Sequence, residues 1–267
     1  MSRTLGAVVI ASLFSPLSAG AAQELEDAHR AFYNAQYESA AALTLAPCLA
    51  GSEEALAACE LRSAALLFQI KRALGEAADK DKAWKQCAVC PELMSAFQRA
   101  VARGQTLARV RLERHPDDRA TLFLLGKINL NHVWLLLGTL GRKTGWSEYW
   151  EGRRALDKVL KVDPGHVRAR VARGWIDYVV DTKMPRGTRW LLGGGNKKRG
   201  LLAVRQAAEA EADFFTRAEA RFALWDMQVR ERDLQQAVVT ARALSRDFPD
   251  NQELNTFLKA HHPSLPH

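Results

Sequence analysis

The segment at residues 183–199, KMPRGTRWLLGGGNKKR, holds the residue types that point most directly to binding chemistry. It carries six cations and no carboxylate, namely Lys183, Arg186, Arg189, Lys197, Lys198 and Arg199. Gly193, Gly194 and Gly195 can adopt left-handed backbone angles, and Asn196 is suited to cap a following helix. Free backbone N–H groups at a helix start attract anions. The pattern predicts either an anion site or an irregular turn into a helix with solvated cations.

A second basic and aromatic stretch, GRKTGWSEYW, lies at residues 141–150. If the helices pair as their pattern predicts, both stretches join the first to the second helix of successive pairs and lie at one end of the array. Aromatic rings beside guanidinium groups suit recognition of anionic groups and protein surfaces; alternatively, the tryptophans plug the helix ends. The predicted binding residues are Arg142, Lys143, Trp146, Trp150, Arg186, Arg189, Trp190, Gly194, Gly195, Asn196 and Lys197, with Tyr149 beside them.

Four cysteines, Cys48, Cys59, Cys87 and Cys90, fall in the first third of the chain. In an exported protein, an even number of cysteines predicts disulfides. Three pairings are possible, and proximity favours Cys48 with Cys59 and Cys87 with Cys90. A redox-active dithiol at Cys87 and Cys90, or a zinc site of four thiolates, are the alternatives.

No catalytic set can be defined from spacing. Groups such as a Ser/His/Asp triad converge only in the fold, and the histidines stand apart; His132, in an apolar helix, fits a core histidine. We therefore expect a protein that is not an enzyme, and predict no cofactor and no metal site.

Residues 1–22 have the layout of a secretory signal peptide. One Arg precedes an apolar stretch at residues 5–14, and small residues follow at Ala19, Ala21 and Ala22. The apolar stretch is shorter than the ~20 residues that span a bilayer, and no later segment looks long and uncharged enough. We expect cleavage and a periplasmic mature chain, residues 23–267, forming one domain without a linker.

The chain is basic, with a formal net charge of +8. Removal of residues 1–22 takes away Arg3 and no acid, leaving 37 basic against 30 acidic residues. Such a balance favours nucleic acid, anionic lipid or acidic partners. Export makes nucleic acid the least suitable of the three.

Apolar residues recur at helical spacing from residue 24 onward, and no strand pattern appears. The predicted helices cover residues 24–45, 53–74, a short stretch around Trp84, 91–113, 118–137, a stretch ending near 162, and then 166–180, 197–210, 216–229, 234–246 and 251–260. Residues 138–152 are expected to form a looser segment before the helix that ends near residue 162. Twice a proline is followed ten residues later by a glycine, from Pro116 to Gly126 and from Pro164 to Gly174. This recurrence predicts stacked helix pairs whose small residues allow close packing.

The segment at residues 218–251 resembles one unit of the tetratricopeptide-repeat (TPR) family. The positions that carry the resemblance are Leu234, Ala237, Ala241, Leu244 and Pro249, and the N-terminal AHRAFYNAQYESAAAL is similar around Ala28, Phe32, Tyr37 and Ala40. Arg170 and Arg221 stand where the family often has an aromatic residue, so the units are divergent. A looser similarity, through a Gly-Gly turn before a helix, is to periplasmic TPR-type partner subunits of TRAP transporters.

The resemblance implies an all-α, right-handed solenoid of divergent TPR-like helix pairs with a concave binding surface. We expect an exported scaffold that holds a protein segment on its first-helix faces in the cell envelope, with the two loops as a rim, in a transport assembly for example. The alternative is a periplasmic small-molecule binder, in which the GGGNKK turn holds a carboxylate or phosphate and Trp190, Leu191 and Leu192 cover its apolar part.

Overall fold

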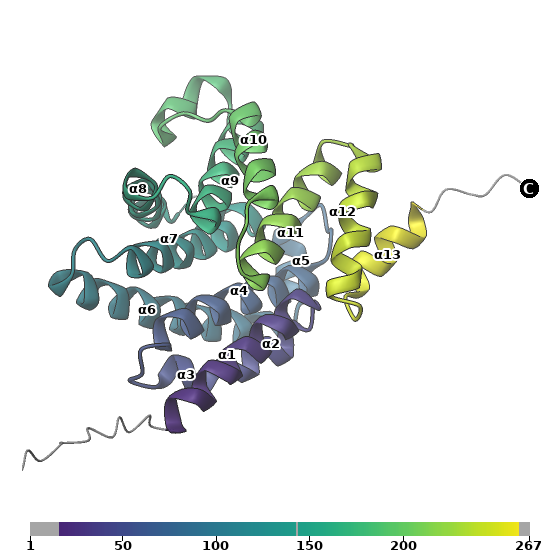
Figure 1. The fold of residues 1–267 in the computed structure, drawn as a ribbon. Helices are drawn as coiled ribbons and strands as arrows, with labels where there is room; N and C mark the ends of the chain where they lie inside the picture. Colours follow the sequence, from purple (N-terminus) through teal and green to yellow (C-terminus); the bar gives the residue numbers. More distant parts are fainter. Residues whose placement is uncertain (1–15, 143, 262–267) are drawn as a thin grey trace, which may run out of the picture.

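The computed structural model describes residues 16–142 and 144–261, and within these ranges every regular element is a helix (Figure 1). The all-α prediction is therefore confirmed for this part of the chain. Most of the predicted signal peptide, residues 1–15, and the predicted site residue Lys143 lie outside the described residues.

The helices follow one another along the chain with short connections. They are α1 (Pro16–Tyr33), α2 (Tyr37–Leu43), α3 (Leu45–Leu49), α4 (Ala55–Leu74), α5 (Lys80–Gln86), α6 (Cys90–Arg114), α7 (Arg119–Val133), the π-helical turn η1 (Trp134–Thr139), α8 (Trp146–Val162), α9 (Val167–Lys183), the 3₁₀ turn η2 (Arg186–Leu192), α10 (Lys197–Glu209), α11 (Phe214–Arg230), α12 (Leu234–Asp247) and α13 (Gln252–Ala260).

Consecutive helices pack against each other in pairs. The first helices of the pairs are α1, α4, α7, α9 and α11, and the second helices are α2, α6, α8, α10 and α12. Each second helix also contacts the first helix that follows it, and α4 packs on α7 as α9 packs on α11. This sequential packing is consistent with a solenoid.

The small residues of the proline-to-glycine units do allow close packing. Gly126 of α7 meets Gly152 of α8, where an added Cβ on Gly152 would lie 3.1 Å from the Gly126 carbonyl oxygen. Gly174 of α9 meets Gly200 of α10, where a Cβ on Gly200 would lie 2.5 Å from the Gly174 carbonyl oxygen. In both of these pairs of helices the two backbones approach closely because the residue at the contact is a glycine on both helices.

Several helix boundaries differ from the predicted ones, and the first helix begins at Pro16 instead of near residue 24. The predicted helix at 24–45 is broken after Tyr33, because Ala35 adopts a left-handed backbone angle of 58° and lets α2 fold back on α1. The predicted helix ending at residue 137 changes at Trp134 into η1, where Leu140 N–H donates to Leu135 O five residues earlier. The looser segment expected at 138–152 ends at Gly145, so Trp146 already belongs to α8.

One helical stretch corrects the expectation that no later segment is apolar enough to cross a membrane. Residues 119–139, which form α7 and η1, meet that test by length and composition. The share of its apolar window buried inside the protein is 67%. Its partners are α4, α6 and α8, so this stretch serves as a core helix here.

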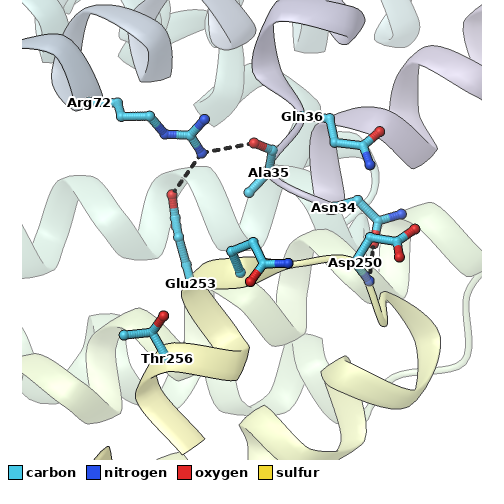
Figure 2. A pocket seen from close by; sticks show the side chains of 8 residues that line it. Asn34, Ala35, Gln36, Arg72, Asp250, Glu253 and Thr256 are labelled. Atoms are coloured by element: carbon cyan, nitrogen blue, oxygen red, sulfur yellow. Dashed lines mark hydrogen bonds and ion pairs between the residues drawn. The ribbon is translucent and has the colours of Figure 1, made fainter. Parts of the chain in front are cut away.

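The two ends of the row of helix pairs contact each other. Tyr33 of α1 packs with its ring 5.4 Å from the rings of Phe222 and Phe248. The side-chain amide of Asn251 donates to the Tyr33 carbonyl oxygen at 2.7 Å. Arg72 of α4 reaches Glu253 of α13 at 3.3 Å beside a surface cavity of about 660 Å³ (Figure 2). The first and last pairs are thus fastened by both apolar and polar contacts.

Two disulfides brace the N-terminal third. Cys48 of α3 is bonded to Cys59 of α4, and Cys87, at the end of α5, is bonded to Cys90, the first residue of α6. This is the pairing that proximity in the sequence favours. A zinc site of four thiolates needs free sulfurs, and all four sulfurs are in disulfides.

Candidate functional site

The connection between α9 and α10 has the turn chemistry that the sequence predicts. Gly193 and Gly194 adopt left-handed backbone angles of 72° and 73°, and the Asn196 side chain accepts the Arg199 N–H at 2.9 Å as the N-cap of α10. Gly195 has no left-handed angle. Its role is close approach, because a Cβ there would lie 2.6 Å from the backbone nitrogen of Asp181.

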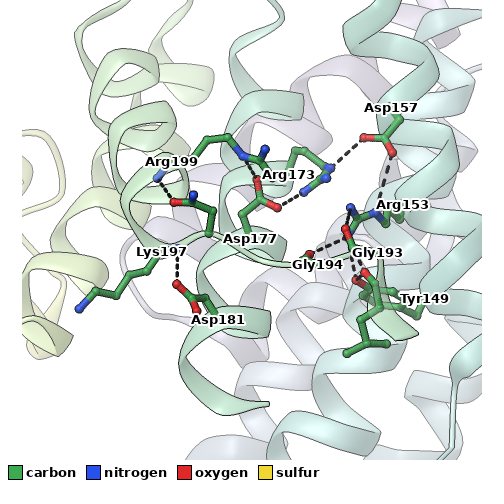
Figure 3. A network of polar contacts seen from close by, with 12 residues as sticks. Tyr149, Arg153, Asp157, Arg173, Asp177, Asp181, Gly193, Gly194, Lys197 and Arg199 are labelled. Carbon is green, nitrogen blue, oxygen red and sulfur yellow. Dashed lines mark hydrogen bonds and ion pairs between the residues drawn. The ribbon is translucent and has the colours of Figure 1, made fainter. Parts of the chain in front are cut away.

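Carboxylates from neighbouring helices neutralise half of the cations of this segment. Figure 3 shows two of the carboxylates, Asp177 and Asp181 of α9, beside Arg199 and Lys197. Asp181 of α9 accepts the Lys197 backbone N–H at 2.8 Å and pairs with the Arg189 guanidinium. Lys197 Nζ lies 2.7 Å from Glu231, and Arg199 Nε lies 2.8 Å from Asp177. The first free N–H of α10, where the anion was predicted, is thus bonded to an internal carboxylate.

A buried arginine that the sequence did not single out ties the two predicted loops together. Arg153 of α8 donates to the carbonyl oxygens of Leu192 at 2.7 Å and Gly193 at 2.9 Å (Figure 3). The Tyr149 hydroxyl donates to the same Leu192 oxygen at 2.8 Å. Burial raises the pKa of Tyr149, so this hydroxyl remains a donor. Arg153 follows Tyr149 by four residues on the same helix face, which is the signal that would have found it.

The remaining predicted residues are not gathered into one pocket. The Arg142 guanidinium lies 5.4 Å from the Trp84 ring of α5, and Trp150 is half-buried with Arg153 5.8 Å from its ring. Trp146 and Trp190 point outward, with 41% and 72% of their surface exposed. Trp146 and Trp190 are therefore available for contact with another molecule, and Trp150 is a packing residue.

A cavity of about 370 Å³ lies at the opposite ends of the first helices. It is lined by Ala57, Ala120, Phe123, Leu124, His166, Val167, Arg168 and Thr216. These residues lie at or next to the first turns of α4, α7, α9 and α11, whereas η1 and η2 follow the last turns of α7 and α9. Since α9 has 17 residues, about 25 Å separates the two ends. We call this cavity the inner pocket.

An ionic cluster lies beside the inner pocket, between the first helices. Glu60 of α4, Lys127 of α7, Arg168 of α9 and Glu219 of α11 form it. Lys127 Nζ lies 2.6 Å from Glu219, Arg168 Nε donates to Glu219, and Arg168 Nη2 lies 3.7 Å from Glu60. All four side chains are largely buried. Because the four residues come from four helices, the sequence did not reveal them.

The cluster sets the ionisation of Glu219. Burial by itself would raise the pKa of this carboxyl, but the charges of Arg168 and Lys127, and the hydrogen bonds they donate, outweigh burial and hold the pKa at about 2. Glu219 therefore stays ionised beside Arg168 and Lys127, and the cluster contains two acidic and two basic side chains. Their charges balance, which is the condition for keeping ions away from water.

His29 of α1 lies near this cluster and stacks on Phe215 of α11 with ring centroids 5.2 Å apart. Burial first, and then the positive charge of Arg168, lower the pKa of His29 to about 4. Its Nδ1 is buried without a hydrogen-bond partner in the described residues. His29 is therefore neutral near pH 7, as an aromatic packing group at the contact between α1 and α11.

Comparison of the chain with protein-family models, with curated proteins and with solved structures gives no match.

Proposed function

We propose that the chain is an exported, non-catalytic scaffold that holds a segment of a protein partner. In this proposal the helix pairs are divergent TPR-like units in a right-handed solenoid, and the partner segment lies where the first turns of α4, α7, α9 and α11 meet. The consecutive pairing of helices and the glycine contacts between paired helices support the architecture. The two disulfides suit an oxidising compartment such as the periplasm.

The observation that carries the proposal is the inner pocket. Phe123, Leu124 and Val167 give it an apolar wall, Ala57 and Ala120 leave the space, and about 370 Å³ accommodates one or two apolar side chains. A side chain anchored in such a pocket typically supplies much of the affinity of an interface. The pocket lies at the opposite ends of the first helices from the two basic loops, so we place the partner segment at the pocket instead of between the loops.

The sequence also allowed a small anionic ligand at the glycine turn, but the Asp181 carboxylate already occupies the backbone N–H group that such a ligand would use. Such a ligand would have to displace Asp181 from the Lys197 backbone N–H. It would also meet Arg189 and Lys197 already paired with carboxylates. These contacts favour the protein-binding proposal over this alternative.

A substitution that fills the inner pocket tests the proposal. Ala120→Trp adds a large side chain at the exposed first turn of α7, and Ala102→Trp adds the same side chain on the exposed face of α6 as a control. The mature protein is used to capture partners from envelope extracts after cross-linking, with quantification by mass spectrometry. We expect at least about a tenfold loss of specific partners for Ala120→Trp only. Equal recovery by both variants, with unchanged melting temperatures, would contradict the proposal.

A further inference from the structure

The connection between α9 and α10 exposes two large apolar side chains next to each other. Trp190 is 72% exposed and Leu191 is 52% exposed. In Figure 1 this segment stands away from the helix stack above α10. We call residues Lys183, Arg186, Trp190, Leu191 and Lys198 the tip.

The apolar side chains are exposed by a folded turn. The Trp190 indole N–H donates to the Gly187 carbonyl oxygen at 2.9 Å, and the Gly193 N–H donates to the Trp190 carbonyl oxygen at 3.0 Å. The next residue, Leu192, is buried and is held by Tyr149 and Arg153 of α8. Because the turn is already ordered, binding through Trp190 and Leu191 would lose little further conformational entropy.

The charges around these side chains are positive. Lys183, Arg186 and Lys198 are exposed, and their side chains have no ion-pair or hydrogen-bond partner in the part of the chain that the structure describes. The nearby carboxylates are already used: Asp181 pairs with Arg189, Glu231 with Lys197, and Asp177 with both Arg173 and Arg199. A surface that meets this connection therefore encounters an apolar pair on a segment that also carries three cations without a partner in the described residues.

We propose that the tip docks on the surface of an anionic phospholipid bilayer. Trp190 and Leu191 enter the interfacial layer, where tryptophan is favoured because its ring is apolar and its N–H is polar. Lys183, Arg186 and Lys198 lie at the level of the lipid phosphates. An apolar insertion combined with several cations is the two-part attachment that peripheral binding requires.

The shape of the tip favours a bilayer over a protein as the occupant. The exposed apolar surface is a projecting turn with two side chains, and neither of the cavities described above is lined by a tip residue. A protein interface needs a much larger complementary area, whereas a bilayer accepts a small projecting wedge from any direction. The net positive charge of the whole chain adds to the attraction.

Docking at the tip leaves the inner pocket free, because that pocket lies at the other ends of the first helices, about 25 Å away along α9. The inference goes beyond the proposed function and does not depend on it. A chain that fails to capture a protein partner can still bind lipid, and the reverse also holds.

The test is co-sedimentation of the mature protein with vesicles. One set contains phosphatidylcholine alone, and the other contains phosphatidylcholine with phosphatidylglycerol. We expect binding to the anionic vesicles that weakens with added salt, and little binding to the neutral ones. The variant Lys183→Ser/Arg186→Ser/Lys198→Ser should bind about a hundredfold more weakly, at about fivefold per cation. Trp190→Ser/Leu191→Ser should lose at least about tenfold.

Matched variants control for general loss of charge or apolar surface. Lys158→Ser/Lys161→Ser/Arg246→Ser removes exposed cations near the C-terminal ends of α8 and α12. Leu234→Ser/Val239→Ser removes apolar side chains of α12 that are 40% and 60% exposed. Both controls should bind like the wild type, and melting temperatures verify that every variant is folded.

Three results would overturn the inference. One is failure of the wild type to sediment with phosphatidylglycerol vesicles, and another is wild-type binding by a folded tip variant. The third is binding to native envelope vesicles that depends on the tip, because the folded tip variants lose it, and that disappears when the vesicle proteins are first digested, since this result assigns the tip to a protein partner.

Discussion

The substitution Glu219→Gln should destabilise the fold strongly although it changes no shape. Glu219 accepts hydrogen bonds from Lys127 and Arg168, and the pKa of its carboxyl is lowered from 4.5 to about 2. This shift corresponds to about 3 kcal/mol of folding free energy, at about 1.4 kcal/mol per pKa unit. Removing one partner of a buried ion pair typically costs about 3–5 kcal/mol. Both estimates predict a loss of about 3 kcal/mol at neutral pH.

The same interaction predicts a pH dependence with a definite sign. Because the folded pKa of Glu219 lies below the unfolded value, its stabilisation is fully present above pH 4.5 and is lost as the pH falls toward about 2. The Glu219→Gln variant has no carboxyl to titrate. Its free energy of unfolding should therefore fall less than that of the wild type over this interval.

Urea unfolding followed by circular dichroism measures both effects. Glu209→Gln, at an exposed position near the end of α10, serves as the control and should change stability by less than about 0.5 kcal/mol. Adding Lys127→Met to Glu219→Gln restores charge balance between Glu60 and Arg168. We expect the double variant to lose at least about 1 kcal/mol less free energy of unfolding than the losses of Glu219→Gln and Lys127→Met added together.

The reasoning fails if Glu219→Gln unfolds within about 1 kcal/mol of the wild type at neutral pH. It also fails if the effects of Glu219→Gln and Lys127→Met simply add. Either result would mean that water shields the cluster well enough for the ions not to depend on each other.

Three further predictions concern packing and pH. Because the pKa of His29 is lowered from 6.5 to about 4, the wild type should lose up to about 3 kcal/mol as the pH falls through this range, and melting curves of His29→Phe should lack that loss. Gly200→Ala should push α10 away from α9 and cost about 1–3 kcal/mol in urea unfolding, whereas Gly187→Ala meets no atom within 4 Å and should be neutral. Arg153→Met removes the donor to the Gly193 carbonyl oxygen and one of the two donors to the Leu192 oxygen, so limited proteolysis should cut residues 184–195 faster than in the control Arg154→Met.

Much of the local structure could be predicted because it depends on residues close in sequence. Helical spacing of apolar residues predicted most helices to within a few residues, and Asn196 was predicted as an N-cap and is one. The break at Ala35 was missed, because a left-handed alanine has no sequence signal and is stabilised by contacts with the last helices. The change of α7 into a π-helical turn was also missed.

In the candidate site, too, the features set by residues close in sequence could be predicted and those set by distant residues could not. The sequence identified the cations of the α9–α10 connection and its glycines, but the carboxylates that pair with half of these cations lie on α9 and at the end of α11. The inner pocket and its ionic cluster were missed entirely, since their residues come from helices spread over more than 150 positions.

The sequence by itself determined that this protein is helical, where most helices begin and end, which small residues face a neighbour, and which turn presents cations. Those features follow from backbone preferences and from the period of the apolar residues within single segments. Tertiary structure alone decided which cations remain unpaired, that Trp190 faces outward while Trp150 packs inward, and that four first helices enclose a balanced set of buried charges. The reason is that pairing and burial depend on distances between helices, which packing of the whole chain sets.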